Sequence, residues 1–147
     1  MILIKSPQTL EEFRQYYELR YQVLREPWGQ VRGTEKDDYE PLSEHFMAVD
    51  EATGKLVGVV KLFEKEPGLG WVSHMAVIST HQRKGIGKLL MAKVEERARE
   101  HGMTRLGCYS RLTTTEYFKR MGFEIAGLPT RYFGNTQVVW MEKELAS

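Results

Sequence analysis

The sequence predicts a mixed α+β fold whose sheet is mostly antiparallel. Short apolar segments separated by glycine-containing turns recur between residues 45 and 78, as in a meander of adjacent strands. Two amphipathic segments with helical spacing, at 10–24 and from 86 to near 102, precede and follow that meander. A length of 147 residues with 41% hydrophobic and 28% charged residues is typical of one globular domain, so a single domain is expected over 1–147.

The first elements are a short strand and a capped helix. Residues 2–5 (ILIK) predict a strand. Thr9 and Glu12 have the spacing of a capping box, in which each side chain accepts a hydrogen bond from the other residue's backbone N–H, so a helix is expected over 10–24. Residues 25–43 contain proline, glycine and acidic residues without periodicity, which indicates a loop, and loops of this length often serve function.

The middle of the chain predicts three adjacent strands. They cover residues 45–49, 55–63 and 71–78, and all are rich in valine, leucine or other apolar residues. Turn-forming residues at 50–54 and 67–70 separate them. Connections this short favour an antiparallel meander over parallel strands, which need longer crossovers.

The second half of the chain predicts two helices and three strands. Apolar residues recur at helical spacing from Ile86 onward, and Gly102 is suited to end that helix because glycine readily adopts a left-handed conformation. The remaining elements are shorter: strands at 105–109, 123–126 and 137–141, and a helix at 113–121.

The composition argues against several classes of function. A formal net charge of +1 gives no general attraction to nucleic acid or to an anionic membrane. No apolar run approaches the ~18 residues of a membrane span, and the first residues lack the basic region of a signal peptide. Cys108 is the only cysteine, so a reducing, cytoplasmic location is expected. No histidine or cysteine cluster has metal-ligand spacing, so no metal is expected.

The most informative stretch is HQRKGIGKLLMAKV, residues 81–94, where a predicted strand turns into a helix. The first N–H groups of a helix lack intrahelical acceptors and, with the helix dipole, attract anions, phosphate above all. Gly85 and Gly87 allow a tight turn and a close approach of a ligand to the backbone. Three basic side chains add positive charge and favour a phosphate-bearing ligand: Arg83, Lys84 and Lys88.

Two common phosphate motifs do not fit this turn. A P-loop requires serine or threonine after its lysine, whereas Leu89 follows Lys88. The dinucleotide fingerprint requires a third glycine, where this chain has Leu90, and a parallel βαβ setting, which a meander does not provide.

The segment from Met75 to Gly87 (MAVISTHQRKGIG) resembles the acyl-CoA motif of the GNAT N-acetyltransferases. That motif, [QR]-x-x-G-x-[GA], follows a strand that ends in a triplet like Met-Ala-Val, and its three fixed positions are filled here by Gln82, Gly85 and Gly87. The segment YFKRMGF at 117–123 also lies at the distance from this motif that the family's pattern leads us to expect. The resemblance covers nearly the whole chain in the order of its elements.

The resemblance implies a three-layer α/β/α fold: a mixed, mostly antiparallel central sheet of about seven strands with one splayed pair, flanked by about four helices. It also implies acetyl-CoA as co-substrate. The CoA pyrophosphate would be held by the backbone of a run of residues, which are Gln82, Arg83, Lys84, Gly85, Ile86, Gly87 and Lys88. The pantetheine arm would lie along Met75, Ala76 and Val77, with the Val77 N–H facing the thioester oxygen.

The general acid is the point at which the chain departs from the family. Many members carry a tyrosine four residues before the glycine of the Y-x-x-x-G-F motif, and Phe118 stands at that position here. Tyr117 is one residue earlier, about 100° around a helix, and is therefore expected to face away from the sulfur. Tyr109, at the end of the preceding predicted strand, is the substitute that we expect to act as catalytic acid.

His74 is the first candidate for the general base because its ordinary pKa suits neutral pH. Strand alternation argues against it, because a strand that directs Met75 and Val77 toward CoA also directs Ser73 there and turns His74 away. Many relatives have a glutamate at the position of Ser73. A chain of water molecules is the alternative route for the amine proton.

The acceptor is expected to bind at the long loop, where the family builds its acceptor site. Arg25 and Trp28 are the candidate substrate residues: arginine suits a carboxylate or phosphate, and an indole in a polar loop suits the wall of a cleft. Acidic residues at 35–38 would instead suit a cationic amine. Both signs of charge are present, so the composition does not choose between acceptors.

The predicted function is transfer of the acetyl group of acetyl-CoA to a primary amine of a small molecule, with no nucleic-acid or membrane partner. A homodimer is a candidate assembly. A non-catalytic acyl-CoA-binding module is the first alternative, because Phe118 replaces the usual acid. An acyl-homoserine-lactone synthase is the second, on the arginine, tryptophan and acidic residues at 20–38, although those enzymes generally lack the glycine turn.

Overall fold

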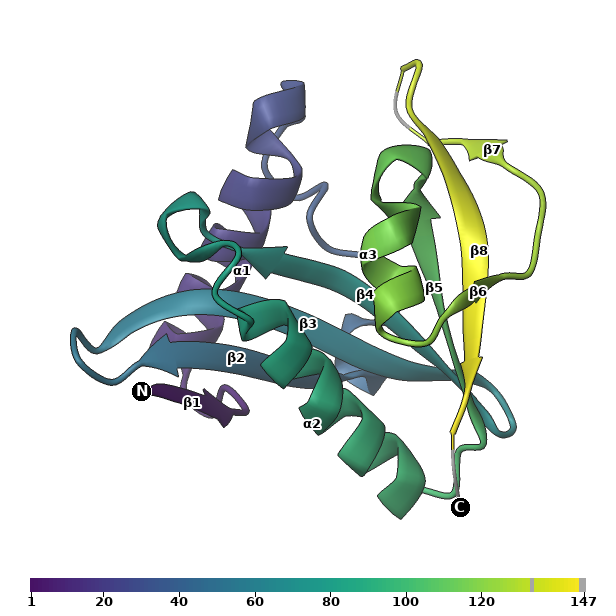
Figure 1. Cartoon of the computed structure of the whole chain (residues 1–147). Helices are drawn as coiled ribbons and strands as arrows, with labels where there is room; N and C mark the ends of the chain where they lie inside the picture. The colour runs from purple at the N-terminus through teal and green to yellow at the C-terminus, as the bar shows by residue number, and fades with distance from the viewer. Residues whose placement is uncertain (133, 146–147) are drawn as a thin grey trace. The chain divides into compact units, whose positions relative to one another are not determined.

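The computed structural model describes residues 1–132 and 134–145 and contains a mixture of helices and strands (Figure 1). The strands are β1 Ile2–Lys5, β2 Glu44–Asp50, β3 Lys55–Glu66, β4 Leu69–Val77, β5 Arg105–Arg111, β6 Glu124–Ile125, β7 Thr130–Arg131 and β8 Gln137–Glu144. The α-helices are α1 Leu10–Leu24, α2 Ile86–Glu100 and α3 Thr115–Arg120. Short 3₁₀ turns lie at η1 Glu26–Trp28, η2 Glu40–Leu42, η3 Ser79–His81 and η4 Leu112–Thr114.

This arrangement confirms the predicted α+β class with a mostly antiparallel sheet. The hydrogen-bonded strand order is β1-β2-β3-β4-β5-β8-β6, with β7 paired to β8. Two details differ from the prediction. The described residues form three α-helices rather than about four, because the loop after α1 contains only 3₁₀ turns, and the short strand β7 was not expected. None of these helices is long and apolar enough to span a membrane.

The described residues group into two compact units, each with its own contacts. The first contains Met1–Phe63 and His74–Val94, and the second contains Glu64–Ser73 and the chain from Glu95 onward. Both β3 and β4 contribute residues to each unit. The predicted splay of β4 from β5 involves residues of both units and stays a prediction.

In the first unit, α1 and α2 cover opposite faces of a sheet. Strand β2 pairs antiparallel with both β1 and β3. Tyr16 and Leu19 of α1 pack with Met47 and Val59 in a buried core cluster. Neighbouring residues of a strand face opposite sides, and the neighbour of Val59, Gly58, lies against α2. The predicted capping box begins α1: the Thr9 hydroxyl accepts from the Glu12 N–H at 3.0 Å, and the Glu12 carboxylate accepts from the Thr9 N–H at 3.2 Å.

In the second unit, the first part of β4 pairs in parallel with β5, with Trp71 opposite Gly107. Strand β5 then pairs antiparallel with β8, which also pairs with β6 and β7. One face of this sheet is buried, and its largely inaccessible side chains are Leu106, Cys108, Phe123, Val139 and Met141. Burial also raises the pKa of the Cys108 thiol to about 12, which fits the expected role of a small apolar side chain.

Gly58 sets how closely α2 approaches the sheet. A Cβ built at Gly58 would lie 3.2 Å from a side-chain carbon of Ile86, 3.2 Å from one of Leu90 and 3.4 Å from the Ala76 carbonyl oxygen. A single added carbon therefore already crowds the first turn and a half of α2. The larger, branched side chain of valine would push α2 away from the sheet.

We predict that Gly58→Val lowers the free energy of unfolding by about 1–3 kcal/mol, the usual cost of overpacking a core, with a smaller loss for Gly58→Ala. Urea denaturation followed by circular dichroism measures both. Ala52→Val, in the exposed turn between β2 and β3, is the control and should change stability little. Equal stability of Gly58→Val and this control would contradict the proposed contact.

Candidate functional site

The turn between β4 and α2 contains two residues with a left-handed backbone. Strand β4 ends at Val77, η3 follows, and α2 begins at Ile86. Arg83 and Gly85 both adopt left-handed conformations, with φ of 64° and 80°. Glycine tolerates this conformation, whereas it is uncommon for arginine. Two left-handed residues so close together give this segment the sharp turn that leads the strand into the helix.

The first N–H groups of α2 lie outside the helical ladder. The Leu89 N–H donates to the Gly85 carbonyl at 3.0 Å and closes the first turn, so the N–H groups of Ile86, Gly87 and Lys88 precede that bond. Residues 82–85 and Lys88 are exposed, whereas Ile86 and Gly87 are buried. The turn thus combines backbone N–H donors with basic side chains at the buried start of α2. This arrangement suits a phosphate group.

Two side-chain contacts hold the turn, and sequence analysis did not predict either. The Gln82 amide donates to the Val77 carbonyl at 3.0 Å and ties the loop back to the end of β4. His81 Nε2 lies 3.0 Å from Asp50 Oδ2, which connects η3 to the end of β2. This histidine contact is the first cause of the lowered pKa of Asp50. Gln82 therefore has a side-chain role beyond the backbone role expected from the motif.

His74 interrupts β4 just before Met75, Ala76 and Val77. Its φ of 55° is left-handed, which is uncommon for a residue other than glycine. Side chains alternate between the two faces of a strand only while the backbone stays extended. The left-handed backbone of His74 breaks this pattern, so alternation no longer implies that Ser73 and Met75 share a face. Burial, followed by the charges of Arg20 and Lys61, lowers the pKa of His74 well below its ordinary value.

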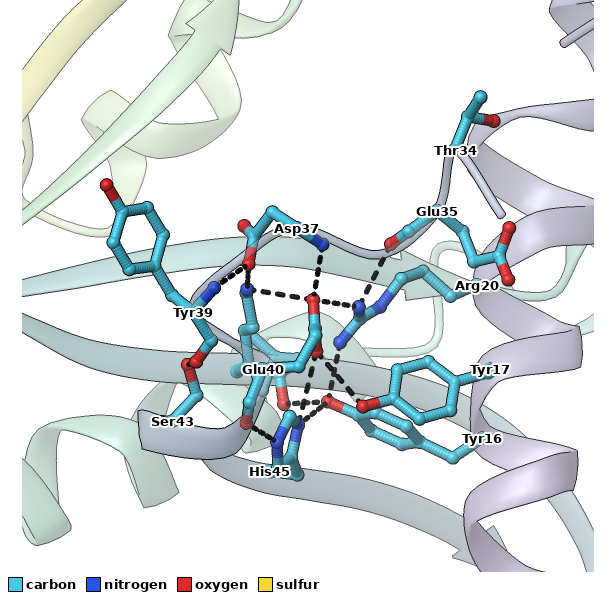
Figure 2. A network of polar contacts seen from close by, with 12 residues as sticks. Tyr16, Tyr17, Arg20, Thr34, Glu35, Asp37, Tyr39, Glu40, Ser43 and His45 are labelled. Carbon is cyan, nitrogen blue, oxygen red and sulfur yellow. Dashed lines mark hydrogen bonds and ion pairs between the residues drawn. The ribbon is translucent and has the colours of Figure 1, made fainter. Parts of the chain in front are cut away.

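A buried network of charged and polar side chains holds the long loop against α1 and the sheet. Figure 2 shows Glu40 at its centre, between Arg20 of α1 and the residues that precede β2. Arg20 donates to the Glu40 carboxylate at 2.8 Å and Lys61 donates to it at 3.0 Å. The Asp37 N–H and the Tyr17 hydroxyl also donate to it, at 3.0 and 3.2 Å. Four donors thus converge on one carboxylate.

The network balances its charges inside the protein. Arg20 is 0% exposed and Lys61 is 1% exposed, and two carboxylates, Glu40 and Asp37, face them. Although burial raises the pKa of Glu40, the Arg20 charge and the hydrogen bonds from Asp37, Arg20 and Lys61 outweigh it and lower the pKa to about 2. The carboxylate is therefore ionised throughout the neutral range and compensates both cations.

His45 and Tyr16 extend the network toward the sheet. His45 Nε2 lies 2.8 Å from the Glu40 carbonyl oxygen, which can only accept, so this nitrogen carries the proton. His45 Nδ1 is 2.9 Å from the Tyr16 hydroxyl. Burial is the main cause that lowers the pKa of His45, so the ring is neutral and Nδ1 is an acceptor. The one hydroxyl proton of Tyr16 can be donated to Nδ1 or to the Val60 carbonyl oxygen, 3.1 Å away. Burial likewise raises the pKa of Tyr16 and keeps that hydroxyl protonated.

The two predicted acceptor-side residues lie on the same unit but in different environments. Arg25 is buried, and its guanidinium donates to the backbone carbonyls of Thr34 and Leu24 at 2.9 and 3.1 Å, which fastens the loop. Trp28, in η1, has 42% of its surface exposed. Trp28 is thus accessible to a ligand, whereas the contacts of Arg25 serve the loop backbone. Binding of an acceptor by either residue stays a prediction.

The predicted acid lies on the second unit. Tyr109 of β5 is 47% exposed and packs against Trp140 with ring centroids 4.9 Å apart and against Trp71 at 6.1 Å. Tyr117 is 42% exposed on α3, and burial of part of its side chain raises its pKa. Phe118, at the family's usual tyrosine position, packs its ring edge-on against Phe123. The roles expected for Tyr109 and His74 stay predictions.

The residues expected to bind the cofactor all belong to the first unit, because Met75–Val77 and the turn up to Lys88 fall within His74–Val94. Among the described residues, no group of three or more histidine, cysteine, aspartate or glutamate side chains could hold a metal ion.

Comparison with known proteins gives a consistent answer. A model of the acetyltransferase (GNAT) family matches residues 10–123. A crystal structure from Lactobacillus plantarum, provisionally assigned as an N-acetyltransferase, is 20% identical with a TM-score of 0.88, and 99% of each chain is covered. An aminoglycoside 6′-N-acetyltransferase complexed with coenzyme A is 16% identical with a TM-score of 0.82, covering 99% of this chain and 98% of that one. A Bacillus subtilis acetyltransferase in complex with CoA is 19% identical with a TM-score of 0.78, covering 99% of this chain and 100% of that one.

We predict that Glu40→Gln lowers the free energy of unfolding by about 3 kcal/mol at pH 7, because it leaves two buried cations with one carboxylate. The pKa of Glu40 is about 2 in the folded protein and 4.5 in its ordinary range. Its stabilisation is therefore present above pH ~4.5 and is lost as the pH falls toward 2. Urea denaturation at pH 7 and at pH 3 measures both effects.

The control for this variant is Glu51→Gln, which removes one negative charge in the exposed turn after β2. It should leave stability nearly unchanged at both pH values. If Glu40→Gln and Glu51→Gln unfold at the same urea concentration, the network does not stabilise the fold as described.

Proposed function

The chain belongs to the acetyltransferase (GNAT) family, and from that premise we propose that it transfers the acetyl group of acetyl-CoA to a primary amine of a small molecule. The observation that carries this proposal is the turn between β4 and α2. Its left-handed residues Arg83 and Gly85 lead the chain into α2, whose first N–H groups precede the first intrahelical hydrogen bond. A pyrophosphate suits such a turn because the dipole of α2 and its first backbone N–H groups both attract the negatively charged pyrophosphate oxygens.

The other proposed contacts with CoA lie along the segment that runs from the end of β4 into this turn. Gln82, Arg83, Lys84, Gly85, Ile86, Gly87 and Lys88 would surround the pyrophosphate. The pantetheine arm would lie beside Met75, Ala76 and Val77, immediately after the left-handed residue that interrupts β4. In this arrangement the Val77 N–H would stabilise the negative charge that develops on the thioester oxygen during attack.

Transfer requires a neutral amine as nucleophile and a proton for the departing thiolate of CoA. We assign the proton donor to Tyr109. His74 is a weak base, because its lowered pKa leaves the ring neutral but unable to hold a proton taken from an alkylammonium ion. Removal of the amine proton by water is therefore the better proposal, with His74 as a neutral polar group near the network.

Two considerations favour a small-molecule amine as acceptor. A formal net charge of +1 gives no general electrostatic attraction to a large acidic partner. One of the structural neighbours is named for acetylation of an aminoglycoside amine. Trp28 is exposed on the loop that carries the network, where it could contact such an acceptor.

The experiment that tests this proposal is a calorimetric titration with acetyl-CoA, followed by a CoA-release assay over amines, amino acids and polyamines. Binding with release for one class of amine supports the transferase and begins to define its acceptor. Binding without release over the whole panel favours an acyl-CoA-binding module, the alternative suggested by Phe118. No binding of acetyl-CoA would overturn the assignment of the turn.

We predict that Lys84→Glu combined with Lys88→Glu weakens acetyl-CoA binding by about tenfold or more, because both exposed side chains would then repel the pyrophosphate. Calorimetry at low ionic strength measures the change. Lys55→Glu combined with Lys119→Glu alters the net charge equally at exposed positions elsewhere and is the control. Equal loss of affinity in both double variants would show that only the net charge matters.

We also predict that Tyr109→Phe lowers kcat at least about tenfold, the range expected for loss of a general acid, while Tyr117→Phe has a smaller effect. Steady-state kinetics with the acceptor found in the screen measures both. Phenylalanine preserves the ring packing of either tyrosine, so the comparison isolates the hydroxyl groups. Equal or reversed effects would contradict the assignment of the acid.

A further inference from the structure

Three aromatic rings of the second unit surround one ammonium group. Lys65 Nζ lies 4.9 Å from the ring centroid of Trp71, 4.8 Å from that of Trp140 and 5.7 Å from that of Tyr109. All three distances fall within the range in which a cation is attracted to the face of an aromatic ring. We call Trp71, Tyr109 and Trp140 the aromatic cage.

The strand register builds this cage. Trp71 of β4 lies opposite Gly107 of β5, and Tyr109 of β5 lies opposite Trp140 of β8. Residues two apart on a strand share a face, so Gly107 and Tyr109 project from the same side of β5. The rings meet at steep angles, 81° between Trp71 and Tyr109 and 64° between Tyr109 and Trp140, and thus form walls rather than a flat stack.

Two features fix the Trp140 wall. A Cβ at Gly107 would lie only 2.0 Å from Cζ2 of Trp140, so the indole occupies space that any other residue at position 107 would need. The Trp140 Nε1–H donates to the Glu142 carboxylate at 2.7 Å, and Arg105 donates to the same carboxylate at 2.8 Å. The cage is therefore shaped in advance, which reduces the cost of binding a ligand.

Lys65 is a weakly held occupant. Its side chain is exposed near the end of β3. In the part of the chain that the structure describes, its ammonium contacts the three rings and makes no ion pair with a carboxylate. A lysine held only by ring faces can exchange with a soluble cation of the same chemistry, because the rings select for charge and size rather than for a particular side chain.

We propose that the aromatic cage is a binding site for alkylammonium groups and that Lys65 competes with the ligand for it. The carboxylate of Glu142 is already engaged by Trp140 and Arg105, so the cage favours cations that need no hydrogen-bond acceptor, such as quaternary ammonium ions. The cage shares Tyr109 with the proposed acetyl transfer, but binding of the cation requires only the three rings of β4, β5 and β8.

The test is a fluorescence titration with tetramethylammonium in a Trp28→Phe background, where Trp71 and Trp140 are the remaining tryptophans. Lys65→Ala should bind tetramethylammonium about fivefold or more tightly than the background. Without the Lys65 ammonium in the cage, a larger fraction of the molecules has an open binding site. The matched control is Lys36→Ala, whose ammonium covers the single ring of Tyr17 at 4.3 Å. This control should leave the affinity unchanged.

Loss of binding in Tyr109→Leu, with the fold verified by circular dichroism, would support the cage. Equal affinity in Lys65→Ala, Lys36→Ala and the background would overturn it, as would undiminished binding in Lys65→Ala combined with Tyr109→Leu. If tetramethylammonium competes with the acetyl acceptor in the release assay, the natural ligand is the ammonium group of that acceptor. If it binds without competition, the ligand is a separate organic cation.

Discussion

The first unit depends on one buried carboxylate. Glu40 belongs to a 3₁₀ turn, but its partners come from α1, the loop before it and β3. Because each partner would be unfavourable inside the protein without it, the helix, the loop and the strand are stable only in this mutual arrangement. A loop with little apolar packing of its own thereby acquires a fixed conformation, which is a requirement for any surface that must recognise an acceptor.

The turn between β4 and α2 is fixed in a different way, mainly by close packing. Gly58 allows α2 to approach the sheet, and Ile86 and Leu90 fill the space that this approach leaves. The Gln82 and His81 contacts then hold the segment between β4 and α2. Backbone donors that are positioned before the ligand arrives bind it without an additional ordering cost. The network thus relies on charge compensation, whereas the turn relies on apolar packing beneath α2 and on two polar contacts of its loop.

Most of the fold was predictable from local patterns. The capping box at Thr9 and Glu12, the meander and the glycine turn depend on residues close in sequence, and the structure confirms each of them. The family was predictable because Gln82, Gly85 and Gly87 stand at fixed spacing in one segment. Strand β7 was not predicted, since its two residues pair with β8 and carry no pattern of their own.

The site was only partly predictable, because its remaining parts depend on distant residues. Lys61 did carry a signal, as a lone lysine within an apolar strand usually has a buried partner, but nothing in the sequence identified Glu40 as that partner. The left-handed backbone of His74 could not be inferred, because residues other than glycine rarely adopt it. The prediction that His74 turns away from CoA assumed that the side chains of β4 alternate regularly, and the backbone of His74 itself breaks that alternation.

The burial of Cys108 has a practical consequence for the study of this protein. The chain has one thiol, which is 3% exposed and has its pKa raised to about 12 by burial. Thiolates rather than thiols react with disulfide reagents, so this side chain is nearly inert to them at neutral pH. Colorimetric detection of liberated coenzyme A can therefore proceed continuously with the native sequence, with no background from the protein and no need for a cysteine-free variant.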